Sequence, residues 1–115
     1  MKRTASAEWR GDLKSGKGTN PEELLAAAHA GCFSMALSAQ LAGANLTAES
    51  IETTCTITLE KQADGFAITE SHLELAARVP GATQAAFDQA VQAAKTGCPV
   101  SKLYHTNITL SSKLL

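Results

Sequence analysis

The chain has 115 residues, a formal net charge of -1 at pH 7 and 44% hydrophobic residues. This length predicts one domain, and the small net charge gives no reason to expect nucleic acid or an anionic membrane as a partner. We identify no apolar run long enough to cross a bilayer and no secretory signal, which predicts a cytoplasmic protein. Because aromatic residues make up only 4% of the chain, the core must be thin, and we expect a second copy to complete it.

The first predicted elements are a strand and a loop. Residues 4–10 alternate weakly and predict a strand. Residues 13–20 are polar and rich in glycine, which indicates a turn. The two lysines of this segment do not form a phosphate-binding loop, because no Gly-Lys-Ser/Thr lies at a strand-to-helix turn.

Residues 20–41 predict a long helix rich in alanine. Asn20 can cap this helix, and Pro21 suits its first position. The apolar residues at helical spacing are Leu24, Leu25, Ala28, Cys32, Met35, Ala36 and Ala39. Nearly all residues between them are small, so neighbours can approach on every side. We therefore expect a central, buried helix with Cys32 near its middle.

Two strands and a turn follow. Residues 50–60 alternate, which predicts a half-buried strand with Cys55 on its apolar face. Residues 63–65 form the turn, and residues 66–79 predict the second strand. Its expected inward side chains are Phe66, Ile68, Leu73 and Leu75. An unpaired cysteine on such a face is most often a small core residue, so we interpret Cys55 as structural.

The last third of the chain predicts a helix, a helical turn and a strand. Thr83 can cap the second helix, whose apolar stripe is Ala86, Phe87, Ala90, Val91 and Ala94. Pro99 suits a first helical position, which places Cys98 at the N-terminus of a short helical turn. Residues 107–114 alternate as the final strand. The order β-α-β-β-α-β predicts an α+β fold, with an antiparallel sheet packed on the long helix and the second helix.

The three cysteines carry the candidate chemistry. Their odd number and wide spacing argue against a secreted disulfide scaffold. Cys98 lies at a predicted helix N-terminus, where backbone N–H groups favour the thiolate. Cys32 lies inside a helix, where burial alone would raise its pKa and leave it inert. A reactive Cys32 needs a cation or a hydrogen bond from elsewhere, and an inert core cysteine is the alternative.

A metal site is a further possibility. His29 and Cys32 lie three residues apart on the helix, and Cys98 and His105 could complete four ligands. Neither pair has the Cys-x-x-Cys spacing of a structural zinc site. We therefore predict no metal and no other cofactor.

Two separated cysteine motifs resemble the OsmC branch of the OsmC/Ohr family. The first begins at Asn20 and reads N-P-E-E-L-x-A-A-A-H-A-x-C-F-S-M-A-L-S. The second, at residues 96–101, reads T-G-C-P-V-S. The W-x-G-D of residues 9–12 and the D-G-F-A-I-T of residues 64–69 also match, so the resemblance covers almost the whole chain.

This resemblance implies a thiol peroxidase that reduces organic hydroperoxides and hydrogen peroxide as an intertwined homodimer. By the same resemblance, Cys32 matches the peroxidatic cysteine, Cys98 the resolving cysteine and Glu22 the carboxylate of the site. It also implies a lipoyl-type dithiol as reductant. Two alternatives stay open, a redox-responsive sensor that does not turn over and a structural dimer with inert cysteines.

The chain departs from the family pattern before the long helix. Family members carry a further segment there that includes an active-site arginine, whereas Asp12 and Asn20 are only eight residues apart here, with no arginine between them. This arginine would be the cation that Cys32 needs. We predict that the purified protein exceeds 12.0 kDa and carries the segment. An intact mass equal to that value would mean that the activating cation is lost.

Overall fold

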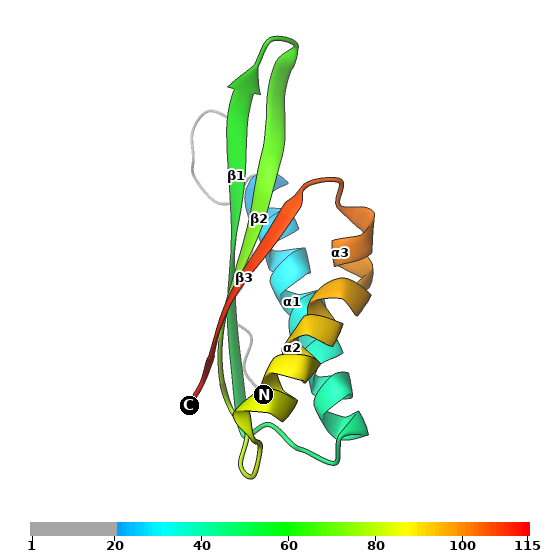
Figure 1. Ribbon diagram of the computed structural model, residues 1–115. Coiled ribbons are helices and arrows are strands. Elements are labelled where there is room, and N and C mark those ends of the chain that lie inside the picture. Colours follow the sequence, from blue (N-terminus) through cyan, green and yellow to red (C-terminus); the bar gives the residue numbers. More distant parts are fainter. Residues whose placement is uncertain (1–20) are drawn as a thin grey trace.

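The structure is a computed structural model that describes residues 21–115. The predicted strand at residues 4–10, the loop at residues 13–20 and the Asn20 cap lie outside the described residues. The elements in chain order are α1 Pro21–Gly43, β1 Ser50–Gln62, β2 Gly65–Arg78, α2 Gln84–Gly97, α3 Pro99–Leu103 and β3 Asn107–Leu114. The helices lie together on one side of the sheet (Figure 1). The α+β class predicted from the sequence is confirmed.

The sheet has the order β1-β2-β3 and is mixed, which corrects the prediction of an antiparallel sheet. β1 and β2 form an antiparallel hairpin, in which Gly65 adopts the positive φ of 126° that the tight turn requires. β3 pairs with β2 in parallel. The reason is the connection, since α2 and α3 return the chain to the first half of β2, where Asn107 pairs with Glu70. A helical crossover of this kind joins parallel strands.

The hairpin extends beyond the helices (Figure 1), and a register shift lies within it, between Thr58 and Leu59. The prediction that Leu73 and Leu75 face inward is confirmed, because both are buried. Phe66 was also expected to be buried, but it is 69% exposed. It lies near the tip of the hairpin, and no described helix covers that end.

α1 continues two residues beyond the predicted range of 20–41, to Gly43, and its buried face differs from the predicted stripe. The buried residues are His29, Ala30, Phe33, Ser34, Leu37 and Leu41. Leu24 and Met35, which belong to the predicted stripe, are 47% and 57% exposed. Alanine on nearly every side of the helix weakens the periodic signal, so the positions of Phe33 and Leu37 decide which face packs inward.

By length and composition α1 could span a membrane, since it has 23 residues and a mean hydropathy of 1.4 over its best window. The sequence-based expectation that no such run exists is therefore wrong. One helix of this kind is weak evidence for a membrane span, because core helices of soluble proteins pass the same test. Phe33, Leu37 and Leu41 are each 0% exposed against the sheet and α2, which is the packing of a core helix.

α2 is amphipathic as predicted. Thr83 caps it by accepting a hydrogen bond from the Ala86 N–H at 3.1 Å. The buried residues Phe87, Ala90, Val91 and Ala94 match the predicted stripe, whereas Ala86 is only partly buried. Together with α1, this face completes the core over β1 and β2.

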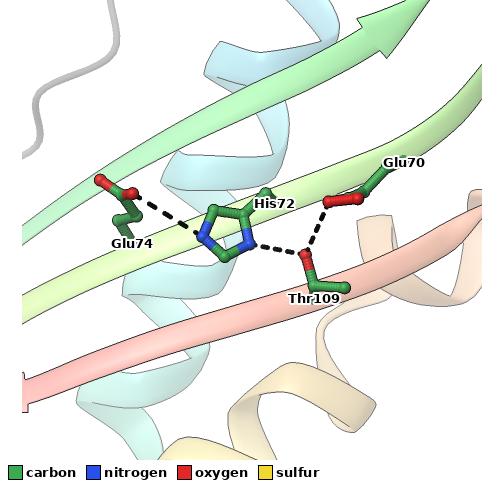
Figure 2. Close-up of polar contacts among 4 residues, drawn as sticks. All are labelled: Glu70, His72, Glu74 and Thr109. Carbon is green, nitrogen blue, oxygen red and sulfur yellow. Dashed lines mark hydrogen bonds and ion pairs between the residues drawn. The ribbon is translucent and has the colours of Figure 1, made fainter.

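The opposite face of the sheet is polar. Glu70, His72 and Glu74 project from β2, and Thr109 projects beside them from β3 (Figure 2). The His72 ring lies 2.6 Å from the Thr109 hydroxyl, measured from Nδ1, and 3.7 Å from Glu74 Oε1, measured from Nε2. The described sheet thus separates a helix-covered inner face from a hydrophilic outer face.

Candidate active site

The structure brings Cys32 and Cys98 together. Cys98 connects α2 to α3, where its N–H donates to Ala94 O at 2.9 Å and its carbonyl accepts from the Lys102 N–H at 3.1 Å. Pro99 occupies the first turn of α3, so the prediction that Cys98 lies at a helix N-terminus is confirmed. The Cys98 side chain is buried, and its thiol lies close enough to the partly exposed Cys32 thiol on α1 to raise the pKa of Cys32. No disulfide joins the two thiols in the structure.

The surroundings of Cys32 act on its pKa in opposite directions. Burial raises the pKa of the Cys32 thiol, and the nearby Cys98 thiol raises it further. The backbone N–H of Val100, in the first turn of α3, donates to the Cys32 sulfur and lowers the pKa. The sequence predicted that the N–H groups of this turn would stabilise the thiolate of Cys98. The turn instead supplies the hydrogen bond from elsewhere that Cys32 was expected to need.

Glu22 is not brought to this pair within one chain. It lies in the first turn of α1, and Cys32 lies ten residues later on the same helix. At 1.5 Å per residue the separation along the axis is about 15 Å. Gly31 does not interrupt the helix, which continues to Gly43. Any contact between Glu22 and Cys32 must therefore come from another copy of the chain.

His29 is buried between α1, β2 and α3. Its Nδ1 lies 2.6 Å from the Ser71 hydroxyl and its Nε2 lies 2.8 Å from the Ser101 hydroxyl. The ring is fully buried, and burial lowers the pKa of His29. With both nitrogens engaged, His29 does not join Cys32, Cys98 and His105 in a ligand set, and residues 21–115 contain no group of three or more potential metal ligands.

A family profile described as OsmC-like protein matches residues 14–113. The chain belongs to the OsmC-like family. Peroxiredoxin OsmC of Escherichia coli (strain K12) is 43% identical to it over 133 residues, which cover 94% of this chain and 93% of the relative. Peroxiredoxin OsmC of Shigella flexneri gives the same values. The predicted OsmC branch is confirmed, and so is the enzyme class, a thiol peroxidase.

Solved structures of OsmC-like proteins share the fold. The organic hydroperoxide resistance protein OhrB of Bacillus subtilis is 30% identical, with a TM-score of 0.66 over 86% of this chain and 72% of that chain. An OsmC-like protein of Vibrio cholerae has a TM-score of 0.76 at 16% identity, over 88% of this chain and 71% of that chain. At that identity the second likeness supports the fold alone.

The alignment with the Escherichia coli OsmC also bears on the length of the chain. Its 133 residues exceed the 115 of this chain, so the relative contains residues that have no counterpart here. The segment predicted to be missing between Asp12 and Asn20 stays a prediction.

Sequence reasoning did not place Tyr104 or Cys55 near His29 and the candidate site. The Tyr104 hydroxyl donates to Leu25 O at 2.8 Å, and its ring meets the His29 ring edge-on at 5.1 Å. Burial raises the pKa of Tyr104, and the nearby charges of Cys55, Cys98 and Cys32 raise it further. Cys55 Sγ lies 3.2 Å from the Ser71 hydroxyl, and burial raises the pKa of this thiol.

Tyr104 also lines an apolar groove of about 320 Å³ beside the start of α1. The other lining residues are Leu25, Ile57, Ile68, Leu103, His105 and Thr106. Leu25 comes from α1, and Ile57 and Ile68 come from β1 and β2.

Proposed function

We propose that this chain reduces organic hydroperoxides and hydrogen peroxide, with Cys32 as the peroxidatic thiol and Cys98 as the resolving thiol. The observation that carries the proposal is the contact between these two thiols at the first turn of α3, where the Val100 N–H donates to Cys32. The names of the relatives, a peroxiredoxin and an organic hydroperoxide resistance protein, support the substrate class.

The proposed cycle uses sulfur alone for the redox chemistry. The Cys32 thiolate attacks the distal peroxide oxygen, the O–O bond breaks, and the alkoxide or hydroxide leaves with a proton as alcohol or water. Cys32 is then a sulfenic acid. The Cys98 thiolate attacks its sulfur, water leaves, and a Cys32–Cys98 disulfide forms. The Val100 N–H favours the thiolate that begins the cycle and stabilises negative charge at the same sulfur.

An external dithiol closes the cycle. One of its thiolates attacks the protein disulfide, and its second thiol then displaces the protein, which returns both cysteines to the reduced form. We propose a lipoyl-type dithiol for this step and a cytoplasmic location, where reduced thiols are available. The groove beside Tyr104 suits an apolar substituent of the hydroperoxide, because its lining is mostly aliphatic and aromatic.

Peroxide consumption with dihydrolipoamide tests the cycle. Cys32→Ser is expected to abolish turnover, because an alcohol forms no sulfenate. Cys98→Ser is expected to react once and then stop as a sulfenic or over-oxidised acid, which mass spectrometry detects. Cys55→Ser, the matched control, is expected to retain turnover. Equal turnover of Cys98→Ser and wild type would refute the resolving role.

The same assay separates the peroxidase from the two alternatives. A sensor would form the Cys32–Cys98 disulfide stoichiometrically without consuming further peroxide. A structural dimer with inert cysteines would form neither the disulfide nor the sulfenic acid. Either result would overturn the proposed function.

We also propose that the site is completed by a homodimer, in which the partner subunit supplies Glu22. Two apolar surfaces support this arrangement. Leu24 and Met35 are exposed on α1, opposite its buried face, and Leu59 and Phe66 are exposed on the projecting hairpin. A partner copy that covers α1 can bring its Glu22 to Cys32 without requiring α1 to bend.

Complementation between two inactive variants tests this supply in trans. Glu22→Gln keeps Cys32, and Cys32→Ser keeps Glu22. If Glu22 acts across the interface, a mixed dimer contains one intact site, and mixing the unfolded variants and refolding them together should restore part of the activity. If Glu22 acts within its own chain, no intact site forms. An active monomer in sedimentation experiments would also refute the proposal.

Activation of Cys32 is the step that depends on the predicted arginine. Among the described residues, no cation acts on the Cys32 thiol, and the Val100 N–H is the one group that lowers its pKa. A chain whose intact mass is 12.0 kDa should therefore react with peroxide little faster than a free thiol. Fast turnover by a protein of that mass would mean that the arginine is dispensable.

A further inference from the structure

His29 is a buried side chain that the proposed cycle does not use. It is 0% exposed, and its two ring nitrogens link elements that are distant in the sequence. Nδ1 reaches Ser71 on β2, and Nε2 reaches Ser101 on α3, at 2.6 and 2.8 Å. A hydroxyl can both donate and accept, so the neutral ring satisfies both bonds with either nitrogen protonated. His29 therefore joins α1 to the sheet and to the helix that begins at Cys98.

α3 has little to hold it in place by itself. It has five residues, and a helix of this length is marginal in water. Its N-cap residue, Cys98, makes no side-chain capping bond. The position of α3 must therefore come from tertiary contacts. Among the described residues, the polar contacts that tie α3 to α1 include the bond from His29 to Ser101, the bond from the Val100 N–H to Cys32 and, at the C-cap, the bond from Tyr104 to Leu25 O.

Ser101 follows Val100 directly in the sequence. The residue that His29 holds is thus the immediate neighbour of the residue whose N–H donates to Cys32. A shift of α3 by a fraction of an ångström would lengthen this donor contact and would move the Cys98 thiol with it. Hydrogen bonds weaken steeply with such changes of geometry.

We propose that His29 is a positioning residue that holds α3, through Ser101, where the Val100 N–H and the Cys98 thiol meet the Cys32 thiol. His29 touches neither thiol of the pair. It acts through the placement of α3, so its loss should change the ionisation of Cys32 and the rate at which Cys98 closes the disulfide. This inference rests on the proposed function only in treating Cys32 as the reacting thiol.

The test measures the ionisation of Cys32 without peroxide. Iodoacetamide alkylates the thiolate, and mass spectrometry of the Cys32 peptide gives its alkylation rate between pH 5 and 10. Ser101→Ala removes the hydroxyl that His29 holds and keeps the backbone of α3. We expect the midpoint of the pH profile to rise by about one unit, which is about tenfold less thiolate at neutral pH. His29→Phe should give the same shift if it folds, and Ser101→Ala decides the matter if it does not.

Ser34→Ala is the matched control. Ser34 is also a buried hydroxyl of the inner region. It donates to Ala30 O at 2.8 Å and lies 2.7 Å from Thr53 Oγ1, away from α3. Its loss should lower the melting temperature and leave the Cys32 midpoint unchanged. An unchanged midpoint in folded Ser101→Ala would overturn the proposal. An equal shift in Ser34→Ala would also overturn it, because the effect would then be general loosening.

The experiment separates this inference from the proposed peroxidase cycle. A shifted midpoint in Ser101→Ala supports the positioning role even if the wild type consumes no peroxide. An unchanged midpoint refutes it even if the wild type turns over rapidly.

Discussion

His29 and His72 lie on opposite faces of the sheet and differ in burial more than in bonding. The inner ring bonds Ser71 on β2, and the outer ring belongs to the very next residue of that strand, His72. Each has a hydroxyl 2.6 Å from Nδ1. His29 is fully buried with both nitrogens bonded, whereas the His72 side chain is 28% exposed and faces Glu74, which is 66% exposed (Figure 2). A hydrogen bond of the same length therefore has different consequences on the two faces, because water can replace the outer one.

The largest expected difference between the two faces concerns adjacent residues of β2. Leu73 is 0% exposed in the core, and Glu74 points outward. Leu73→Ala should lower the free energy of unfolding by about 2–5 kcal/mol, because it removes buried methyl groups and leaves a cavity. Glu74→Ala should change it by less than about 0.5 kcal/mol.

Urea unfolding of both variants checks this contrast. The protein concentration must be equal in all samples, because the stability of a dimer depends on concentration. Similar losses for both variants would mean that the outer face is also covered in the folded protein.

The second prediction concerns the pH dependence of stability. Burial lowers the pKa of His29 below the 6.5 of an exposed histidine. Below pH 6.5 the unfolded chain therefore binds more protons at this position than the folded chain does. The stability that neutral His29 contributes is complete above pH 6.5 and is lost as the pH falls toward the lowered folded value, by at most about 1.4 kcal/mol per pH unit.

His29→Gln removes this proton and should flatten the stability profile between pH 6.5 and 5, relative to wild type. His72→Gln is the matched control and should leave the slope in place. Denaturant unfolding at several pH values measures both. A slope that persists in His29→Gln would place the responsible proton on another group.

The two faces also differ in how well the sequence predicted them. The strands, α2 and its cap followed from local signals, since Phe87 and Val91 are bulky residues at clear helical spacing. The inward face of α1 could not be predicted from local signals, because small residues surround Phe33 and Leu37 on every side. The parallel direction of β3 depends on how the crossover returns, and nothing in residues 107–114 themselves encodes it.

The site was predictable only in part. Cys32 and Cys98 were identified because the motifs around them resemble those of the family. The structure then showed that the two thiols lie close together. The bond between His29 and Ser101 joins residues 72 positions apart, and no local pattern indicates such a pairing. Glu22 was identified by the same resemblance, and the uninterrupted α1 keeps it about 15 Å from Cys32 within one chain.

The smallest expected effect belongs to the outer histidine. Thr109 donates its hydroxyl proton to Glu70 at 3.2 Å, so it accepts the 2.6 Å hydrogen bond from Nδ1–H of His72 (Figure 2). The glutamine amide of His72→Gln can donate to the same hydroxyl, and water can replace the bond where it does not reach. The 3.7 Å contact with Glu74 is solvent-exposed, and such pairs contribute little. We therefore expect a change of less than about 0.5 kcal/mol in the free energy of unfolding and no change in peroxide turnover. A loss above about 1 kcal/mol would contradict this expectation. The difference in burial would then not explain the contrast between the two histidines.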